Sequence, residues 1–445
     1  MILQKFLFIG LGGSGGKTLR FLKRDIRQWM ESNGQGNRVP EGWKFLHIDT
    51  PTTPDGNEIN DIVPQLAEDE YLGLINVGID MHAVQSNLDS KNNLHSEMRS
   101  WRIPPSRVLV PLDEGAGQFR AIGRTVAMWT SGRMKQIIAE ALDELSEAEV
   151  QSQLKTISND VNGDDTGECK THVIIVSSLA GGTGAGLIQD VCDIIRAMGN
   201  TEYSNQIFGI LYAAEAFDAL VSDQTKGVQP NTLAAVSELL NGHWHNGDKD
   251  ANANNQTNPV IHDEVLKGAG LPSQILRSGP NFPFLVGRKG TGGIDYESPI
   301  KLFEMVGRSL LSWVTSPTVQ DKFIAYTITN WEMAAEGRNM DDAENDQLVN
   351  RGSKDEHGLP AFSGLGFGRL SVGTEYFEEY ATQRIVRSAH AQAKDFHDTS
   401  DLAKEYKESL GTNDANEVAK KLAQDNLDKF LSLAKLDEVG PEAND

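Results

Sequence analysis

A glycine-rich stretch near the N-terminus has the composition of a phosphate-binding loop. Residues 6–18 read FLFIGLGGSGGKT, so an apolar run turns into a glycine-rich segment that ends in a lysine and a threonine. Glycine has no Cβ, and this lets successive backbone N–H groups crowd around an anion at the start of a helix. The stretch therefore predicts a site for a phosphorylated ligand.

Two common phosphate-binding patterns can be compared with this stretch residue by residue. The P-loop pattern, G-x-x-x-x-G-K-[ST], would need a glycine at the position of Leu11. The dinucleotide pattern, G-x-G-x-x-G, fits Gly10, Gly12 and Gly15, and Asp49 could serve as its acidic partner. That second pattern is common in unrelated sequences, so the first stretch by itself leaves the fold open.

A second glycine-rich segment follows the apolar run His172–Val176. Residues 177–186 read SSLAGGTGAG, and the sequence after them is typical of a helix. A dinucleotide-dependent oxidoreductase needs no second loop of this kind, and a P-loop protein would carry an aspartate here to manage Mg²⁺. Two glycine loops that open from one sheet favour a nucleotide whose phosphates are bound from two sides.

The second loop resembles the signature of the tubulin/FtsZ superfamily, [SAG]-G-G-T-G-[SA]-G, at every position from Ala180 to Gly186. The first loop is similar to that family's G-x-G-G-x-G, with matches at Gly10, Gly12, Gly13 and Gly15. The opening stretch therefore resembles the first phosphate loop of a tubulin-type nucleotide domain.

Two further segments resemble the same family and follow in its order along the chain. Residues 47–50, HIDT, resemble the strand end with which the family approaches Mg²⁺ and phosphate. Residues 114–124, EGAGQFRAIGR, are similar to the FtsZ loop near the terminal phosphate. The matching residues there are Gly115, Ala116, Gly117, Gly123 and Arg124. By motif order, the resemblance covers roughly residues 1–315.

The resemblance implies a GTP-binding cytoskeletal protein that assembles with itself into longitudinal filaments and hydrolyses nucleotide at the subunit junction. Backbone N–H groups of residues 10–16 and 181–186 would hold the α- and β-phosphates, and Gly115–Gly117 would close on the γ-phosphate. The cofactors would be GTP or GDP with Mg²⁺, with ATP as the other purine nucleotide. The implied nucleotide-binding residues are Gly10, Gly12, Gly13, Ser14, Gly15, Lys17, Asp49, Gly115, Ala116, Gly117, Arg124, Ala180, Gly181, Gly182, Thr183, Gly184, Ala185, Gly186 and Phe303.

Several positions depart from the pattern of the family. Lys17 replaces an asparagine that reads the guanine base in FtsZ, and it could contact phosphate or ribose or simply begin the helix. Ala121 replaces a glutamate that contacts ribose. Phe303 fits the position that packs on the base, but Arg308 stands where the family has a base-reading aspartate, and arginine accepts no hydrogen bonds. A preference for guanine is therefore implied by the family and has little direct support from these residues.

The resemblance also implies a catalytic acid at Asp321, in the segment TSPTVQDKF after the central helix. In the family, an acidic residue there enters the neighbouring subunit's site and orients the attacking water. The family's N-x-D-F-A-D sequence is absent, and Asp321 could instead be a helix N-cap. Without a catalytic acid, the chain would be a nucleotide-dependent switch or scaffold with little or no turnover.

Alternating strands and helices must position these loops. Apolar runs predict strands at Lys5–Ile9, Lys44–Ile48, Arg107–Leu112, His172–Val176, Gln206–Ala213 and Phe282–Val286. Longer amphipathic segments predict helices at Lys17–Met30, Phe119–Ser146, Leu187–Met198 and Asn231–Asn241, and a central helix at Pro299–Val314. This order predicts an α/β fold with a parallel sheet, helices on both faces, and ligands at the carboxyl ends of the strands.

The sequence pattern changes after residue 297, which suggests a division into domains. We expect a tubulin/FtsZ-like nucleotide-binding domain at 1–297, a central helix and following loop at 298–320, a reduced α+β second domain at 321–395 and an acidic helical tail at 396–445. The second domain shows two strand-like runs, KFIAYTIT and FSGLGFGRLSV. The tail helices could pack on the body or bind a protein partner, because amphipathicity alone does not separate these roles.

Composition limits the kinds of partner. The 445-residue chain has a net charge of −22, which argues against a nucleic acid or an anionic membrane surface. Cys169 and Cys192 have no ligand spacing and are typical of buried thiols in a reducing cytoplasm. No run approaches the ~18 apolar residues of a membrane helix. We therefore expect a cytoplasmic protein, without direct membrane insertion, that binds copies of itself.

Overall fold

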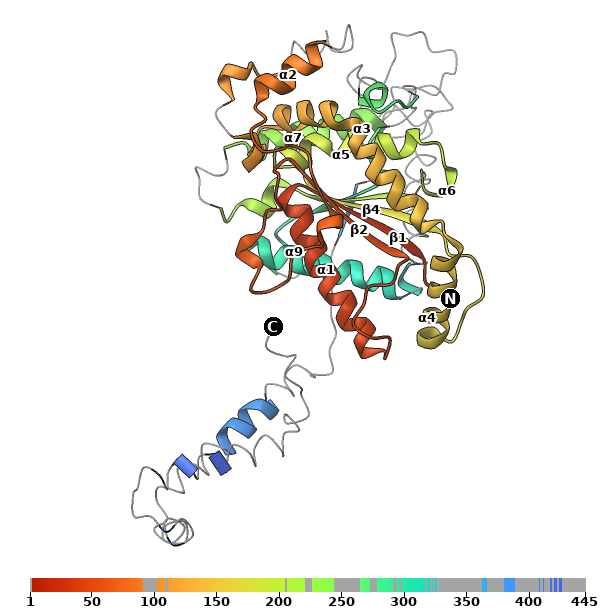
Figure 1. Ribbon diagram of the computed structural model, residues 1–445, viewed down its shortest axis with the longest axis vertical. Helices are drawn as coiled ribbons and strands as arrows, with labels where there is room; N and C mark the ends of the chain where they lie inside the picture. The colour runs from red at the N-terminus through yellow and green to blue at the C-terminus, as the bar shows by residue number, and fades with distance from the viewer. Residues whose placement is uncertain are drawn as a thin grey trace, which may run out of the picture. The chain divides into compact units, whose positions relative to one another are not determined.

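The computed structural model of the chain describes the following residues: 2–90, 102–108, 111–204, 206–220, 226–243, 265–272, 278–290, 294–296, 298–316, 318–320, 362–365 and 380–388, with residues 322, 325, 408, 411, 417, 420, 421, 424 and 425. Met1–Phe367 form one compact unit, and Gly368–Asp445 form a second. The sheet and the two cavities considered below belong to the first unit (Figure 1).

Among the described residues, the strands form one seven-stranded sheet in the order β3-β2-β1-β4-β5-β6-β7. All neighbouring strands are parallel. The strands are β1 (Lys5–Leu11), β2 (Trp43–Asp49), β3 (Tyr71–Gly73), β4 (Thr171–Ser178), β5 (Ile207–Tyr212), β6 (Phe282–Val286) and β7 (Ser363–Gly364). Because β1 pairs with β4 in parallel, the glycine loop that follows each strand lies at the same edge of the sheet.

The central strands are buried along their whole length, which explains their nearly continuous apolar sequences. In β1, Leu7 and Ile9 belong to the hydrophobic core on one face of the sheet, whereas Phe6 and Phe8 belong to the core on the other. This division follows from the alternation of side chains along a strand. The sheet therefore has a separate core on each face.

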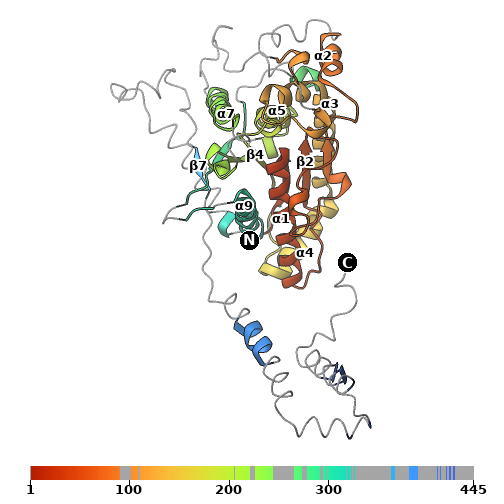
Figure 2. The same cartoon turned by 90° about the vertical axis from the view of Figure 1, so that its left-hand side faces the viewer.

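Helices cover both faces of the sheet (Figures 1 and 2). Helices α3, α5 and α7 lie on one face, and α1 and α9 lie on the other. The helices are α1 (Gly12–Ser32), α2 (Met81–Ser90), α3 (Arg120–Leu145), α4 (Ala148–Asn162), α5 (Thr183–Ala197), α6 (Thr201–Ser204), α7 (Val228–His243) and α9 (Pro299–Thr315). Short 3₁₀ turns are η1 (Asn57–Ile59), η2 (Glu68–Glu70), η4 (Pro105–Arg107), η5 (Leu112–Glu114) and η6 (Ala214–Phe217).

The predicted α/β fold with a parallel sheet is confirmed, and most of its strands lie where the sequence placed them. The strand predicted at Arg107–Leu112 is wrong, because its described ends belong to η4 and η5. Prolines flank this apolar run, and proline cannot donate a hydrogen bond to a sheet ladder. The neighbour of β2 at the edge of the sheet is the short strand β3, which the sequence did not predict.

Helix α9 is the predicted central helix, and its start follows from local sequence. The Ser298 hydroxyl accepts a hydrogen bond from the Ile300 amide at 3.3 Å, and Pro299 occupies the first helical position. Further along, the Glu304 carboxylate accepts from both Arg24 of α1 and Arg308, each at 3.0 Å. Arg308 therefore belongs to an ion network between α1 and α9.

The region after α9 is described only in part. Lys322 and Ala325 are helical, so the strand predicted over 322–329 is wrong at these two residues. Of the second predicted strand, Ser363–Gly364 pair with β6 in the main sheet. Asp321 lies outside the described residues, as do most of the predicted second domain and tail. In the second unit, residues 380–388 form a helix with exposed side chains.

Acid should weaken the fold through His172, which is buried in β4 between Phe6 and Phe208. Burial, together with the smaller effect of the nearby charge of Lys170, lowers the pKa of His172 to about 4. Between about pH 6.5 and pH 4, His172 therefore binds a proton in the unfolded chain but not in the folded chain. We expect the free energy of unfolding to be unaffected by His172 above pH 6.5 and to fall by roughly 3 kcal/mol as the pH drops to 4.

Urea unfolding at pH 7 and at pH 4.5 would measure this contribution. The variant His172→Phe should lose less stability between the two pH values than the wild type does. The control His82→Gln removes an exposed histidine of α2 and should behave as the wild type. Equal losses in wild type and His172→Phe would contradict the expectation.

Candidate functional site

A cavity of about 220 Å³ opens at the carboxyl ends of β1, β2 and β4. Its walls come from the start of α1, the residues after β2, the segment before α3, and the turn between β4 and α5. The lining residues are Leu11, Gly12, Gly13, Ser14, Asp49, Pro51, Asp55, Glu114, Gly115, Ala116, Gly117, Ser178, Gly181, Gly182, Thr183 and Gly184. The fold therefore brings together the four segments that the sequence singled out.

Not every residue implied by the sequence reaches this cavity. Its lining omits Gly10, Gly15, Lys17, Arg124, Ala180, Ala185, Gly186 and Phe303. It includes residues that sequence reasoning missed: Leu11, Pro51, Asp55, Glu114 and Ser178. Leu11, Glu114 and Ser178 lie inside the glycine-rich segments quoted from the sequence, and Pro51 directly follows HIDT, so their place in the sequence was a signal that could have been used.

Two helix N-termini meet at the cavity. Gly12, Gly13 and Ser14 form the first turn of α1, while Thr183 and Gly184 begin α5. Neither helix has an acidic residue in its first turn, and neither receives a hydrogen bond from a capping side chain. First-turn N–H groups have no partner within their own helix, and they carry the positive end of the helix dipole. Two such ends at one cavity form a strong anion site.

Some glycines of the first motif serve close packing. A Cβ on Gly15 would lie 2.4 Å from the Val176 carbonyl oxygen, and a Cβ on Gly10 would lie 2.7 Å from the Gly15 carbonyl carbon. Both obstacles are backbone atoms, so no side-chain rotation could relieve them. Gly10 and Gly15 therefore let α1 pass at backbone contact over β1 and β4, which sets its N-terminus at the cavity.

Glycines also permit close contact between α3 and the second motif. A Cβ on Gly123 would lie 2.4 Å from the Gly182 carbonyl oxygen, and a Cβ on Gly186 would lie 2.9 Å from the Arg124 amide nitrogen. In contrast, a Cβ on Gly181 would meet no atom within 4 Å. Gly181 is therefore the position where a methyl group would reach the cavity without displacing the protein.

The segments 115–117 and 181–184 are joined directly through their backbones. The Gly182 amide donates to the Gly117 carbonyl oxygen at 2.8 Å. Gly115 and Gly117 have φ values of +123° and +54°, a region in which a residue with a Cβ is strained. The segment before α3 thus depends on glycine for its shape and is held against the turn before α5.

The Thr183 hydroxyl already has a partner inside the protein. Its Oγ1 lies 2.6 Å from the Oγ1 of Thr50, and both residues are buried. Thr50 follows Asp49 directly, so this contact ties the end of β2 to the start of α5. When Thr50 donates to Thr183, the hydroxyl hydrogen of Thr183, which lines the cavity, is left for a ligand.

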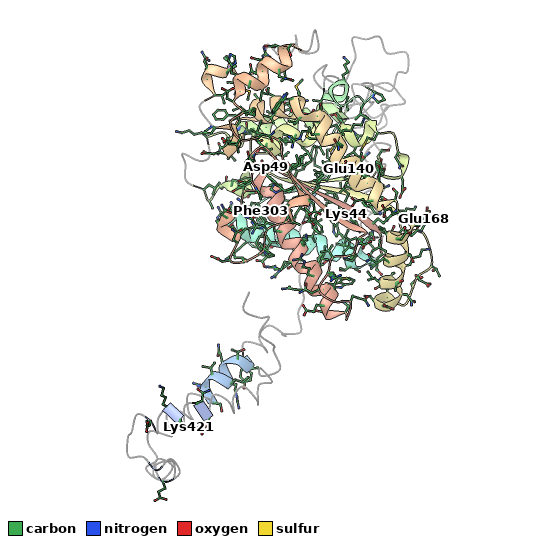
Figure 3. All side chains as sticks on the ribbon, viewed as in Figure 1. Lys44, Asp49, Glu140, Glu168, Phe303 and Lys421 are labelled. Atoms are coloured by element: carbon green, nitrogen blue, oxygen red, sulfur yellow. The ribbon has the colours of Figure 1, made fainter. Side chains whose placement is uncertain are left out.

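Three carboxylates also line the cavity: Asp49, Asp55 and Glu114. Asp49 is buried at the end of β2 (Figure 3). Its Oδ1 accepts a hydrogen bond from the Thr50 amide at 2.7 Å. Its Oδ2 lies 3.6 Å from Nε2 of His47, which donates to the Gly12 carbonyl oxygen at 3.1 Å. The cavity lining therefore contains both groups that attract anions and groups that attract cations.

Lys17 lies outside the cavity lining and is held by two acidic side chains, one of which, Asp55, lines the cavity. Its Nζ lies 3.1 Å from Oδ2 of Asp55 and 2.5 Å from Oε1 of Glu58. Burial alone would lower the pKa of Lys17, but the hydrogen bonds and charges of Glu58 and Asp55 outweigh it, and the pKa is raised. The lysine thus fastens the segment after β2 to α1. The prediction that Lys17 begins the helix is wrong, because α1 begins at Gly12 and Lys17 lies in its second turn, in an ion pair.

Arg124 also makes contacts within the protein fold. Its guanidinium donates to Oδ1 of Asp190 at 3.1 Å and lies 3.7 Å from Glu238. Arg120 pairs with Glu238 as well and reaches the Ala185 carbonyl oxygen at 3.3 Å. These charges link α3, α5 and α7 beside the cavity, so Arg124 helps to hold the helices that form its walls.

Phe303 packs in the core between α9 and the sheet (Figure 3). It is 4% exposed, and its ring meets Tyr212 edge-on with centroids 5.2 Å apart. The Tyr212 hydroxyl is 2.7 Å from Oγ1 of Thr18 on α1. The structure therefore places Phe303 behind the first turns of α1, where it supports the helix.

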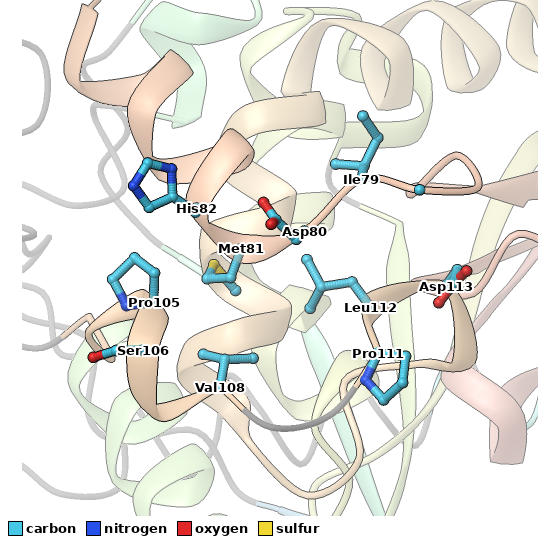
Figure 4. Close-up of a pocket in the computed structure, with 11 residues that line it drawn as sticks. Ile79, Asp80, Met81, His82, Pro105, Ser106, Val108, Pro111, Leu112 and Asp113 are labelled. Carbon is cyan, nitrogen blue, oxygen red and sulfur yellow. The ribbon is translucent and has the colours of Figure 1, made fainter.

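A second cavity, of about 540 Å³, lies next to the first (Figure 4). Met81, Val108 and Leu112 supply apolar walls, and Asp80 and Asp113 supply carboxylates. The two cavities share the segment 111–117, since residues 111–113 line one and 114–117 line the other. The larger cavity contains none of the glycine motifs, so we assign the anion-binding geometry to the smaller one.

Two searches for other kinds of site gave negative results within the described residues. No helix there is long and apolar enough to cross a bilayer. In the same part of the chain, no group of three or more His, Cys, Asp or Glu side chains is arranged to hold a metal ion by itself.

Comparisons with known proteins identify the family. A family model described as "Tubulin like" matches residues 7–391. The solved structure of CetZ2 from Haloferax volcanii, a GTPγS-bound protofilament, is 14% identical, with a TM-score of 0.32. The similarity covers 70% of this chain and 59% of that chain, so it spans less than two thirds of CetZ2. A search of curated proteins found no match. Because the family model matches most of its length, this chain belongs to the tubulin-like family.

Proposed function

We propose that this protein binds GTP together with Mg²⁺ in the 220 Å³ cavity. The observation that carries the proposal is the meeting of two uncapped helix N-termini, those of α1 and α5, at a cavity lined by glycine backbone. Such an arrangement binds phosphate groups through N–H donors and helix dipoles. Membership of the tubulin-like family supports the choice of GTP over ATP, and GDP would be the product.

The carboxylates of the cavity lining, Asp49, Asp55 and Glu114, fit a magnesium ion. Mg²⁺ prefers oxygen ligands, keeps several waters, and is usually shared between one or two carboxylates and substrate phosphates. Asp49 and Glu114 line the cavity and could supply such carboxylates, whereas Asp55 is already paired with Lys17. When bound, the ion would neutralise phosphate charge. A shared magnesium ion would therefore allow carboxylates to lie next to the phosphates.

We further propose that the protein assembles with itself, end to end, into cytoplasmic filaments, and that GTP is hydrolysed where one subunit completes the site of the next. The family supports this proposal. Asp321 would be the acid that orients water in the neighbouring site, and the helices predicted near the C-terminus would bind a protein partner. The residues of the cavity would act by positioning phosphates and excluding misaligned water.

Assembly-dependent hydrolysis predicts that activity depends on protein concentration. We expect phosphate release per subunit, measured with GTP and Mg²⁺, to rise as the protein concentration rises. The same series with ATP tests the choice of base. Specific activity that stays constant over a wide concentration range, at a level well above background, would contradict a site shared between subunits.

A nucleotide-dependent switch or scaffold is the second candidate function. It is favoured by Arg308, which occupies the position of a base-reading aspartate and is engaged with Glu304. Nucleotide binding with turnover near zero at every protein concentration would support this second candidate and would remove the proposed role of Asp321. Isothermal titration with GTP and GDP, run beside the phosphate assay, separates it from a protein that binds no nucleotide.

A further inference from the structure

Helix α7 is joined to the wall of the cavity by a reciprocal pair of side chains, Gln118 and Asn231. The Gln118 Oε1 accepts a hydrogen bond from the Gly227 amide at 2.7 Å, just before α7 begins. In return, Nδ2 of Asn231 donates to the Gln118 carbonyl oxygen at 2.7 Å. We call this arrangement the Gln118–Asn231 clasp. It connects residues 113 positions apart in the sequence.

The clasp reaches both glycine segments of the cavity. The same Nδ2 of Asn231 donates to the Ala180 carbonyl oxygen at 2.9 Å. Ala180 immediately precedes Gly181, and Gln118 immediately follows Gly117. Both glycines line the cavity. The side-chain amide of Asn231 thus bonds to the ends of both glycine segments. These bonds add to the direct bond from the Gly182 amide to the Gly117 carbonyl oxygen.

The local sequence is suited to this contact. A Cβ on Gly227 would lie 2.7 Å from Oε1 and 2.8 Å from Cβ of Gln118, so the approach requires glycine. Pro230 lies in the first turn of α7, where its missing N–H costs no helical hydrogen bond. Asn231 follows it and is partly buried, with both donated bonds directed out of its own helix. Asparagine in a helix gains nothing from propensity, so its contacts are its main contribution.

We propose that Asn231, together with Gln118, is a positioning residue that sets the separation between the segments 115–117 and 181–184 for nucleotide binding. This inference rests on the proposed function. The segment 181–184 would hold the inner phosphates, and the segment 115–117 would close on the terminal one. Loss of the clasp should therefore weaken binding of a triphosphate, which needs both segments in register, more than binding of a diphosphate.

The test is isothermal titration of the full chain with GTPγS and with GDP, both with Mg²⁺. The variants are Asn231→Ala, Gln118→Ala and the double variant. Asn231→Ala removes two side-chain hydrogen bonds, and Gln118→Ala removes the bond that holds the Gly227 amide just before α7. For each single variant we therefore expect the ratio of GTPγS affinity to GDP affinity to fall by about tenfold. The double variant should lose little more than the larger single one, because both residues act in one unit.

The matched control is Ser237→Ala on the same helix. It removes a side-chain hydrogen bond of 2.8 Å to the Leu233 carbonyl oxygen, which stays within α7. Its affinity ratio should equal that of the wild type. Thermal unfolding of every variant shows whether the fold is retained, and Gln118→Ala keeps the test open should Asn231→Ala fold poorly.

The outcomes separate the inference from the proposed function. If the wild type binds both nucleotides and the clasp variants lower both affinities equally, or neither, Asn231 only stabilises the fold and the inference is overturned alone. If the wild type binds neither nucleotide, the proposed function fails and takes the inference with it. A fall in the ratio confined to the clasp variants supports both.

Discussion

Gly15→Ala is expected to destabilise the protein by about 3 kcal/mol or more, the upper end of the cost of overpacking a buried contact. The new Cβ would lie 2.4 Å from the Val176 carbonyl oxygen and 2.8 Å from the Gly10 carbonyl carbon. Since both are backbone atoms, α1 could make room only by shifting away from β1 and β4. The measurement is the urea midpoint of the purified variant, with its helix content recorded by circular dichroism.

The matched control for Gly15→Ala is Gly132→Ala in α3. A Cβ on Gly132 would lie 3.8 Å from the nearest atom, the Gly268 carbonyl oxygen, which is an ordinary contact. Because alanine is a better helix former than glycine by roughly 0.5–1 kcal/mol, this variant should be slightly stabilised. Similar stability of the two variants would show that Gly15 is not a packing position.

The glycine motifs predicted where the phosphate loops lie, but not which of their glycines face the cavity and which pack against backbone. The spacing of Gly10, Gly12 and Gly15 and the run Ala180–Gly186 indicated phosphate loops, and the fold places both runs at one cavity. Sequence alone could not say which glycines face the cavity. That division depends on which strand lies beneath each helix, and Val176 is far from Gly15 in sequence.

The charged residues of the motifs were harder to interpret for a similar physical reason. The sequence offers Lys17 a contact to phosphate or ribose, or the start of a helix. In the structure Lys17 instead pairs with Asp55 and Glu58, which follow β2, and the sequence does not show that this segment lies beside α1. Arg124 likewise pairs with Asp190 on another helix. Whether a charge is free for a ligand depends on such distant neighbours, which a single sequence does not supply.

Secondary structure was predictable where an element had a long and clear apolar pattern. The strands β1 and β4 are buried on both faces and read as continuous apolar runs. The error at Arg107–Leu112 came from a short apolar run whose flanking prolines outweigh its hydrophobicity. The missed strand β3 has only three residues, too few to show a period.

Gly181→Ala is the prediction that tests the cavity itself. The added Cβ would meet no protein atom within 4 Å, so the fold should tolerate it. Because Gly181 lines the cavity, the methyl group would occupy space beside the first turn of α5 that a phosphate oxygen needs. We expect the affinity for GTP with Mg²⁺ to fall by at least about tenfold, which is a loss of roughly 1.4 kcal/mol of binding free energy.

Titration calorimetry with GTP measures this loss, and the thermal unfolding midpoint of the same sample shows that the fold is intact. Gly182→Ala would be a poorer test, because its Cβ would lie 2.6 Å from the Gly117 carbonyl oxygen and would disturb the wall. Gly132→Ala again serves as the control, since it makes the same chemical change outside the cavity lining. Unchanged affinity in a folded Gly181→Ala protein would mean that phosphate does not bind at the N-terminus of α5. Lost affinity in Gly181→Ala, with wild-type affinity in Gly132→Ala, would place a phosphate of the nucleotide at the second glycine motif, beside the first turn of α5.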